Sequence, residues 1–177
     1  MAAFKLKKFI FDFQKLRARM QEHIDHDIIW LPATSRTPGA VWSDISEILD
    51  PAIRTQLSQS VGRPLHDIYW ICDYRGCPSL EIHKDNPGNE YPINSRFTII
   101  MMLDGRFEVS LWEDDQTSLI DKVVIHPGEF LVLNNSQYYH SGRVLDGAKL
   151  SLHAYPIIPE IDSLVAPVER LNVELFV

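Results

Sequence analysis

The segment from Arg96 to Leu133 reads RFTIIMMLDGRFEVSLWEDDQTSLIDKVVIHPGEFLVL, and it decides the fold class. It contains short runs rich in β-branched and aromatic residues, the composition that strands prefer. Turn sequences separate the runs, with Asp104-Gly105 after the first and Pro127-Gly128 before the last. Apolar runs divided in this way are typical of consecutive antiparallel strands.

The same pattern continues on both sides of this segment. Short runs at close spacing predict an antiparallel barrel or a double-sheet jelly roll. We expect eight strands, at Asp67–Cys72, Leu80–His83, Arg96–Leu103, Phe107–Trp112, Ser118–Ile125, Glu129–Leu133, Gly142–Leu145 and Lys149–Tyr155.

The residues that precede these strands have helical spacing instead. From Asp12 to Ile29 the apolar residues recur every three or four positions, which predicts an amphipathic helix with Asp12 as its N-cap. A loop should follow from Pro32 to Gly39. A second helix is expected from Asp44 to Ser60, with a break or a restart at Asp50-Pro51, where Asp50 would be the cap. The predicted fold class is therefore mainly β with N-terminal helices.

The length of 177 residues fits one domain, since domains average roughly 150 residues. We expect helical support over residues 1–62, a β core over residues 63–156 and a C-terminal tail over residues 157–177. The tail should contain a short helix or an edge strand from Val168 to Val177. The formal net charge of −7 argues against general binding to a nucleic-acid backbone, because such binding needs a dense basic surface.

Hydropathy and cysteine content bear on location. The apolar stretches are far shorter than the roughly 20 residues of a membrane span, and the apolar part of the N-terminus is too short for a signal peptide. The two cysteines, Cys72 and Cys77, have neither the spacing of a zinc site nor that of a redox pair, which favours reduced thiols. We therefore expect a cytoplasmic protein that does not bind membranes, and the sequence leaves its oligomeric state open.

The first candidate for chemistry is the His-x-Asp sequence formed by His83 and Asp85. Residues i and i+2 of a strand project from the same face, so these two side chains can converge on one ion. His140, which we expect in a turn between two strands, would be the third ligand. Two imidazoles and one carboxylate form the facial triad that holds Fe(II) and leaves positions open for a cosubstrate and O2.

A second candidate is an anion anchor in the last predicted strand. Lys149 and Ser151 are two residues apart and so share one face of that strand. A lysine that points into an apolar barrel needs a carboxylate partner, because burial of an unpaired charge is costly. The alternative is that Lys149 stands at the exposed start of the strand, after Asp146-Gly147.

Taken together, His83-x-Asp85, His140 and Lys149-x-Ser151 resemble the motifs of the Fe(II)/2-oxoglutarate-dependent dioxygenases, and more closely those of their prolyl-hydroxylase-like branch. The resemblance implies a double-stranded β-helix, which is a jelly roll. It also implies that the two histidines and Asp85 bind the iron.

The same resemblance implies the contacts of the cosubstrate 2-oxoglutarate. Lys149 would pair with its distal carboxylate, and Ser151 or Tyr74 would add a hydrogen bond. One departure is that Met101-Met102 stands where prolyl hydroxylases often have a second tyrosine contact.

Two further residues are candidates for contact with the substrate. Arg96 opens a predicted strand and could clamp a carboxylate, and its alternative role is a surface ion pair. His153 continues the alternation of Lys149 and Ser151, and its alternative role is that of a hydrogen-bonded core histidine. A lid over the site is expected in the loop from Asn86 to Ser95.

The resemblance implies an enzyme that converts 2-oxoglutarate to succinate and CO2 and hydroxylates a C–H bond. Its substrate would be a small molecule or the side chain of a peptide or protein. Two alternatives stay open. One is a cupin-type metal enzyme that uses no 2-oxoglutarate and so does not need Lys149, and the other is a non-catalytic jelly-roll module for binding or sensing.

Overall fold

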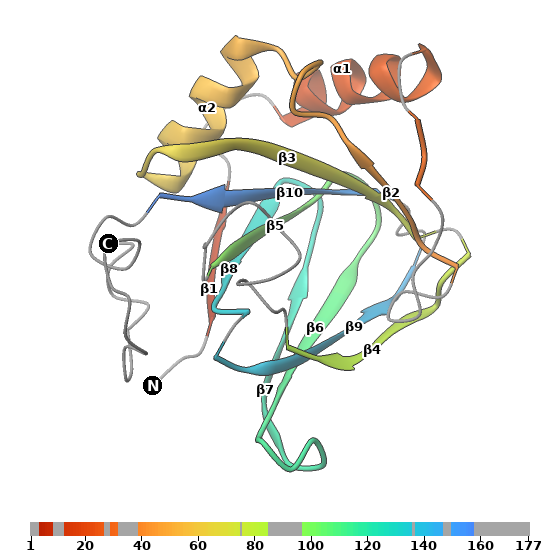
Figure 1. Ribbon diagram of the computed structural model, residues 1–177, viewed down its shortest axis with the longest axis vertical. Helices are drawn as coiled ribbons and strands as arrows, with labels where there is room; N and C mark the ends of the chain where they lie inside the picture. The colour runs from red at the N-terminus through yellow and green to blue at the C-terminus, as the bar shows by residue number, and fades with distance from the viewer. Residues whose placement is uncertain are drawn as a thin grey trace.

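The computed structural model describes residues 4–8, 13–26, 29–31, 39–74, 76–84, 97–135, 137–146 and 150–157. These residues form mainly antiparallel β structure with two helices (Figure 1). The helices are α1 (Phe13–His26) and α2 (Pro51–Val61). The strands are β1 (Phe4–Lys8), β2 (Val41–Asp44), β3 (Leu65–Asp73), β4 (Ser79–His83), β5 (Thr98–Met102), β6 (Phe107–Trp112), β7 (Leu119–Ile125), β8 (Glu129–Leu133), β9 (Tyr139–Val144) and β10 (Leu150–Pro156).

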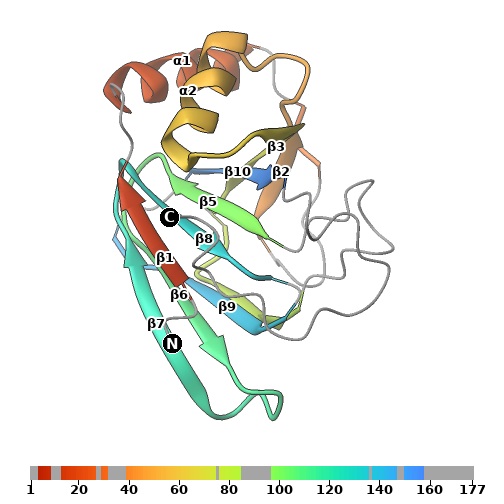
Figure 2. The ribbon, with the colours of Figure 1, turned by 90° about the vertical axis from the view of Figure 1, so that its left-hand side faces the viewer.

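The strands form two sheets. The larger, six-stranded sheet has the order β1-β8-β5-β10-β3-β2, and the smaller, four-stranded sheet has the order β4-β9-β6-β7. The sheets face one another, and both helices cover the outer face of the larger one (Figures 1 and 2). Most neighbours in each sheet are distant in sequence, as in a jelly roll, and the exceptions are the pairs β2-β3 and β6-β7; the predicted fold is thus confirmed.

Strand β5 explains why the quoted segment contains an unbroken apolar run. All five of its residues are buried. Ile99 and Met101 pack in the cluster that the larger sheet forms with the helices, whereas Ile100 and Met102 pack in the cluster between the sheets. A strand covered on both faces does not alternate between apolar and polar residues. The larger sheet therefore lies in the middle of a three-layer arrangement.

The prediction for the second helix was correct only from Asp50 onward. Helix α2 begins at Pro51, and the Asp50 side chain accepts a hydrogen bond from the Ala52 N–H. Proline lacks an N–H and fits the first position of a helix, so the helix starts here. Asp44, where the helix was expected to begin, is the last residue of strand β2, and turns connect this strand to Asp50.

Two strands precede the first one that the sequence analysis expected. Strand β1 pairs with β8, and β2 pairs with β3, so both extend the larger sheet at its edges. Helix α1, at Phe13–His26, confirms the first predicted helix. The division of the chain into support, core and tail stays a prediction, and Val168 to Val177 lies outside the described residues.

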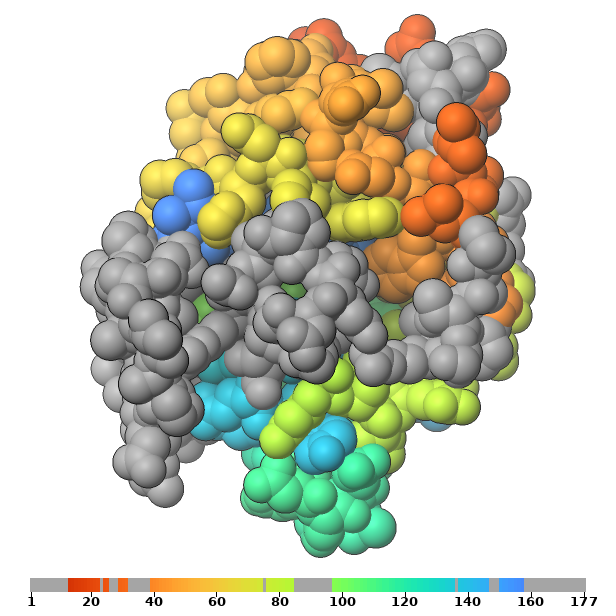
Figure 3. Space-filling view, viewed as in Figure 1, coloured from red at the N-terminus to blue at the C-terminus, as the bar shows by residue number. Residues whose placement is uncertain are grey.

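Figure 3 shows one face of the molecule, with the helical layer at one end and the turn between β6 and β7 at the other. In that hairpin Leu119 and Ile120 are exposed. Neither helix in the described part of the chain is long and apolar enough to cross a membrane.

Candidate metal and cosubstrate site

Two of the predicted metal ligands lie side by side on neighbouring strands of the smaller sheet. His83 ends β4 and stands opposite His140 of β9 in the strand register. Their ring centroids are 4.4 Å apart with an interplanar angle of 53°. The structure therefore brings together two histidines that are far apart in the sequence. It also corrects the expectation that His140 lies in a turn, because β9 begins at Tyr139.

An irregularity in β4 makes this pairing possible. Leu80 pairs with Gly142 and His83 pairs with His140, so β4 has one more residue than β9 between the two pairs. Such a bulge shifts every later side chain to the other face. Leu80 packs against the cluster between the sheets, and the bulge keeps His83 on that same inner side.

The backbone sets the tautomer of both rings. Nδ1 of His83 lies 2.7 Å from the Glu81 carbonyl oxygen, and Nδ1 of His140 lies 3.3 Å from the Tyr138 carbonyl oxygen. A carbonyl only accepts hydrogen bonds, so each Nδ1 carries a proton, and in the neutral imidazole each Nε2 then carries the lone pair. A histidine oriented in this way has the form that binds a metal through Nε2. The two histidines therefore fit an iron site.

A structured turn leads into His140. The Asn134 side chain accepts from the Gln137 N–H at 3.1 Å and donates to Oε1 of Gln137 at 3.0 Å. The Asn134 carbonyl also accepts from the Tyr138 N–H. These bonds fix the position of Tyr138, whose own carbonyl orients the imidazole of His140. The Asn-Asn sequence predicted the turn, but not its role in placing the ring.

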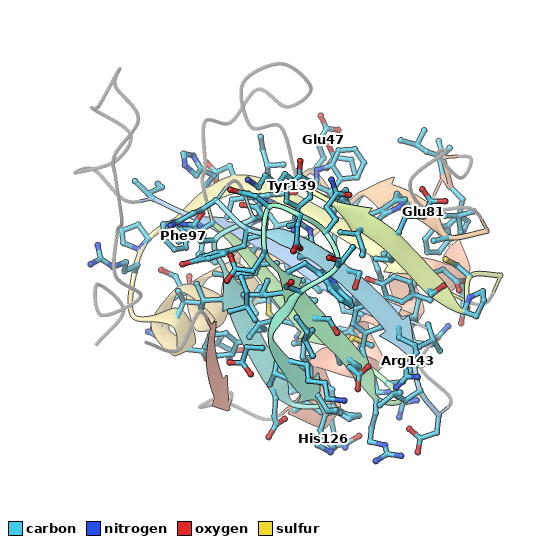
Figure 4. All side chains as sticks on the ribbon, turned by 90° about the horizontal axis from the view of Figure 1, so that it is seen from below. Glu47, Glu81, Phe97, His126, Tyr139 and Arg143 are labelled. Carbon is cyan, nitrogen blue, oxygen red and sulfur yellow. The ribbon has the colours of Figure 1, made fainter. Side chains whose placement is uncertain are left out.

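Charged and aromatic groups lie beside the two histidines. Nζ of Lys84 is 2.8 Å from a carboxylate oxygen of Asp114 and 4.5 Å from the centroid of the Tyr139 ring. Figure 4 shows Tyr139 at the opposite end of the smaller sheet from Arg143 and His126.

Several predicted site residues lie outside the described residues. These are Asp85, Arg96, Lys149 and the proposed lid from Asn86 to Ser95. In the part of the chain that the structure does describe, no group of three His, Cys, Asp or Glu side chains is placed to hold a metal ion. The histidine pair is thus the described portion of the predicted metal site.

The remaining predicted residues form what we call the buried polar cluster, made of Tyr74, Ser151 and His153. The Ser151 hydroxyl donates to the Tyr74 hydroxyl at 2.9 Å and lies 2.8 Å from Nε2 of His153. The Tyr74 hydroxyl is itself 3.5 Å from that nitrogen. All three side chains are buried. The structure therefore brings Tyr74 and Ser151 together, and His153 joins them.

Burial sets the protonation of this cluster. It raises the pKa of the Tyr74 phenol well above its ordinary value, and it raises the pKa of the adjacent Cys72 thiol as well. Both groups therefore keep their protons at neutral pH. The Tyr74 and Ser151 hydroxyls therefore offer hydrogen bonds but no charge, and they do not by themselves supply a countercharge for a bound anion.

Two aromatic rings that the sequence analysis did not select pack against the cluster. The Phe107 ring stacks on Tyr74 with centroids 4.8 Å apart, and the Trp42 ring lies 4.9 Å from that of His153. Val41 and Trp42 are residue types that strands prefer, and this is the signal that could have placed Trp42 on a strand.

Comparison with known proteins supports the fold. No protein-family model and no curated protein sequence matches this chain. Among solved structures, OsALKBH1 is similar with a TM-score of 0.69 and 12% identity, covering 89% of this chain and 99% of that one. A Trichoplax adhaerens prolyl hydroxylase, solved with a peptide of the hypoxia inducible factor oxygen degradation domain, has a TM-score of 0.60 and 10% identity, covering 93% and 88%.

A third similar structure is that of SnoN, a non-heme α-ketoglutarate-dependent epimerase from nogalamycin biosynthesis. Its TM-score is 0.57 at 11% identity, covering 96% of this chain and 88% of that one. Another structure of SnoN contains Fe3+ and α-ketoglutarate, which is 2-oxoglutarate. This chain therefore has the jelly-roll fold of the Fe(II)/2-oxoglutarate-dependent oxygenases.

Proposed function

We propose that this chain is an Fe(II)/2-oxoglutarate-dependent oxygenase that hydroxylates a C–H bond. The observation that supports this most directly is the pair of His83 and His140, held opposite each other with Nδ1 of each ring bound to a backbone carbonyl. The proposed products are succinate, CO2 and a hydroxylated small molecule, peptide or protein side chain.

In this proposal His83, Asp85 and His140 hold the iron. Asp85 follows His83 by two residues, so the three residues supply the donor set of a facial triad. Iron bound by such a triad supplies the activation of O2 and the oxidation of 2-oxoglutarate. The chain supplies histidines whose Nδ1 atoms are bonded to backbone carbonyls, which leaves each Nε2 for the metal.

The buried polar cluster is the proposed site for the cosubstrate. Tyr74 and Ser151 supply hydroxyl groups for a carboxylate of 2-oxoglutarate. Lys149 supplies the positive charge, since the two hydroxyl groups are neutral and an unpaired carboxylate is costly to bury. Arg96 and His153 are the proposed contacts of the substrate.

We also propose a cytoplasmic location. Cys72 and Cys77 are both buried free thiols, which is typical of a reducing compartment.

Succinate formation tests the proposal. Wild-type protein supplied with Fe(II), 2-oxoglutarate and O2 should release succinate, and under anaerobic conditions it should develop a visible charge-transfer band. His140→Ala should lose both signals, because one of the paired imidazoles is gone. His126→Ala is the matched control, since His126 lies at the far end of the smaller sheet (Figure 4), where it pairs with Glu129. This variant should retain both the band and succinate formation. A wild-type protein that gives neither the band nor succinate would refute the proposal.

A further inference from the structure

Gly142 leaves a space in the smaller sheet that one aromatic ring fills. Gly142 is buried on β9, two residues after His140. A Cβ atom on Gly142 would lie 2.3 Å from Cζ and 2.7 Å from Cε1 of Phe107, whereas the next neighbour, Cδ1 of Leu80, would be 3.2 Å away. Gly142 does not have a positive φ, so its backbone would accept alanine. The glycine is therefore required by the ring of Phe107.

The Phe107 ring also contacts the buried polar cluster. It stacks on Tyr74 with an interplanar angle of 23°, and the hydroxyl of Tyr74 accepts the hydrogen bond from Ser151. Tyr74 follows the last residue of β3, and so it lies beyond the regular pairing of that strand. Its ring position therefore depends on the rings and hydroxyls packed around it.

From this geometry we propose that Phe107, seated in the space left by Gly142, is a positioning residue for the cosubstrate. It holds the phenol of Tyr74 where Tyr74 and Ser151 together bind a carboxylate of 2-oxoglutarate. The inference rests on the proposed function and adds to it the residue pair that sets cosubstrate affinity. Phe107 itself touches neither cosubstrate nor metal in this proposal.

Phe130 shows what a purely structural phenylalanine looks like in this fold. It is as fully buried as Phe107, but it packs in the cluster between the larger sheet and the helices. Phe107 belongs to the cluster between the two sheets, together with Tyr74. Phe130→Leu is therefore a control that removes the same volume from the core without reaching the polar cluster.

The experiment measures 2-oxoglutarate affinity by anaerobic titration of the Fe(II)-loaded protein, and Fe(II) affinity separately. Phe107→Leu should weaken 2-oxoglutarate binding by about three- to ten-fold, the effect of misplacing one hydrogen bond. Fe(II) affinity should be unchanged, and Phe130→Leu should match wild type in both measurements. Gly142→Ala should weaken 2-oxoglutarate binding as well, by displacing Phe107.

A double variant separates positioning from general damage. If the alanine at position 142 acts through the ring, then Gly142→Ala combined with Phe107→Leu should bind 2-oxoglutarate no more weakly than Phe107→Leu alone. Unchanged affinity in Phe107→Leu, or an equal loss in Phe130→Leu, would overturn the inference while leaving the proposed function intact. A wild-type protein that does not bind 2-oxoglutarate would overturn both. Phe107→Leu decides the question even if Gly142→Ala does not fold.

Discussion

Oγ of Ser151 lies 2.8 Å from Nε2 of His153, two residues further along the same strand. The same hydroxyl donates to Tyr74, so a single buried group links a side chain of β10 with one that follows the end of β3. Ser151 pairs with Cys72 on one side and with Met102 on the other, which places it in the middle of the larger sheet. Ser151 is fully buried at 0% exposure, so water cannot take the place of its hydroxyl as a hydrogen-bond partner.

Ser151→Ala should therefore destabilise the protein and weaken 2-oxoglutarate binding together. The loss of a buried hydroxyl leaves the Tyr74 and His153 groups short of a partner, which costs about 1–3 kcal/mol of unfolding free energy. Urea denaturation measures the first effect and the KM for 2-oxoglutarate measures the second. Ser110→Ala, in β6 of the other sheet, is the control and should change neither. An unaltered KM would show that Ser151 has a structural role alone.

The burial of Tyr74 predicts that the unfolding free energy of the protein falls at alkaline pH. The ordinary pKa of a tyrosine is 10.0, and burial raises that of Tyr74 in the folded protein. Above about pH 10 the unfolded chain releases this proton while the folded protein keeps it, so the unfolding free energy decreases as the pH rises. Burial raises the pKa values of Tyr69, Cys72 and Cys77 in the same direction, so these groups add to the slope.

Tyr74→Phe should make this alkaline decline shallower without removing it. Urea denaturation at a series of pH values, from about 8 to about 11, measures the slope. Tyr139→Phe is the control, because Tyr139 is only half-buried. Parallel curves for wild type and Tyr74→Phe would contradict the prediction.

Replacement of Arg54 by lysine should lower the stability of the protein. Its Nε donates to the Leu49 carbonyl at 3.0 Å, a second nitrogen donates to the Ser46 carbonyl, and the guanidinium lies over the Tyr69 ring at 5.4 Å. Lysine has no planar fork that could make these contacts together. Arg54→Lys should lower the unfolding free energy by about 1–2 kcal/mol. Arg143→Lys is the control, because Arg143 pairs with Glu108 on the exposed surface. It should lower the unfolding free energy by less than about 0.5 kcal/mol.

The fold was largely predictable because the strands of the core carry their own local signals. The apolar run in β5 and the alternation in β6 (Phe107–Trp112) both reflect which faces are buried. Strand β2 was missed because its four residues adjoin the helically spaced residues that follow, and its partner β3 decides its conformation. Edge strands this short depend on pairing more than on composition.

The geometry of the histidine pair and of the buried polar cluster could not be predicted from the sequence. That His83 and Asp85 are two apart in sequence says nothing of the bulge in β4, which arises from pairing with β9. The contact of Phe107 with Tyr74 likewise depends on a glycine in a third strand. Such contacts across strands follow from register, and register is a property of the folded sheet.

The turn before β9 gives a final test of the histidine pair. Asn134→Ala removes the acceptor for the Gln137 N–H and so loosens the turn whose Tyr138 carbonyl orients His140. Loss of such an outer partner should weaken Fe(II) binding by about ten-fold. Asn134→Asp keeps an oxygen acceptor at the same place and should retain most of the affinity. Equal Fe(II) affinity in the alanine and aspartate variants, measured by anaerobic titration, would show that the turn does not orient the ring.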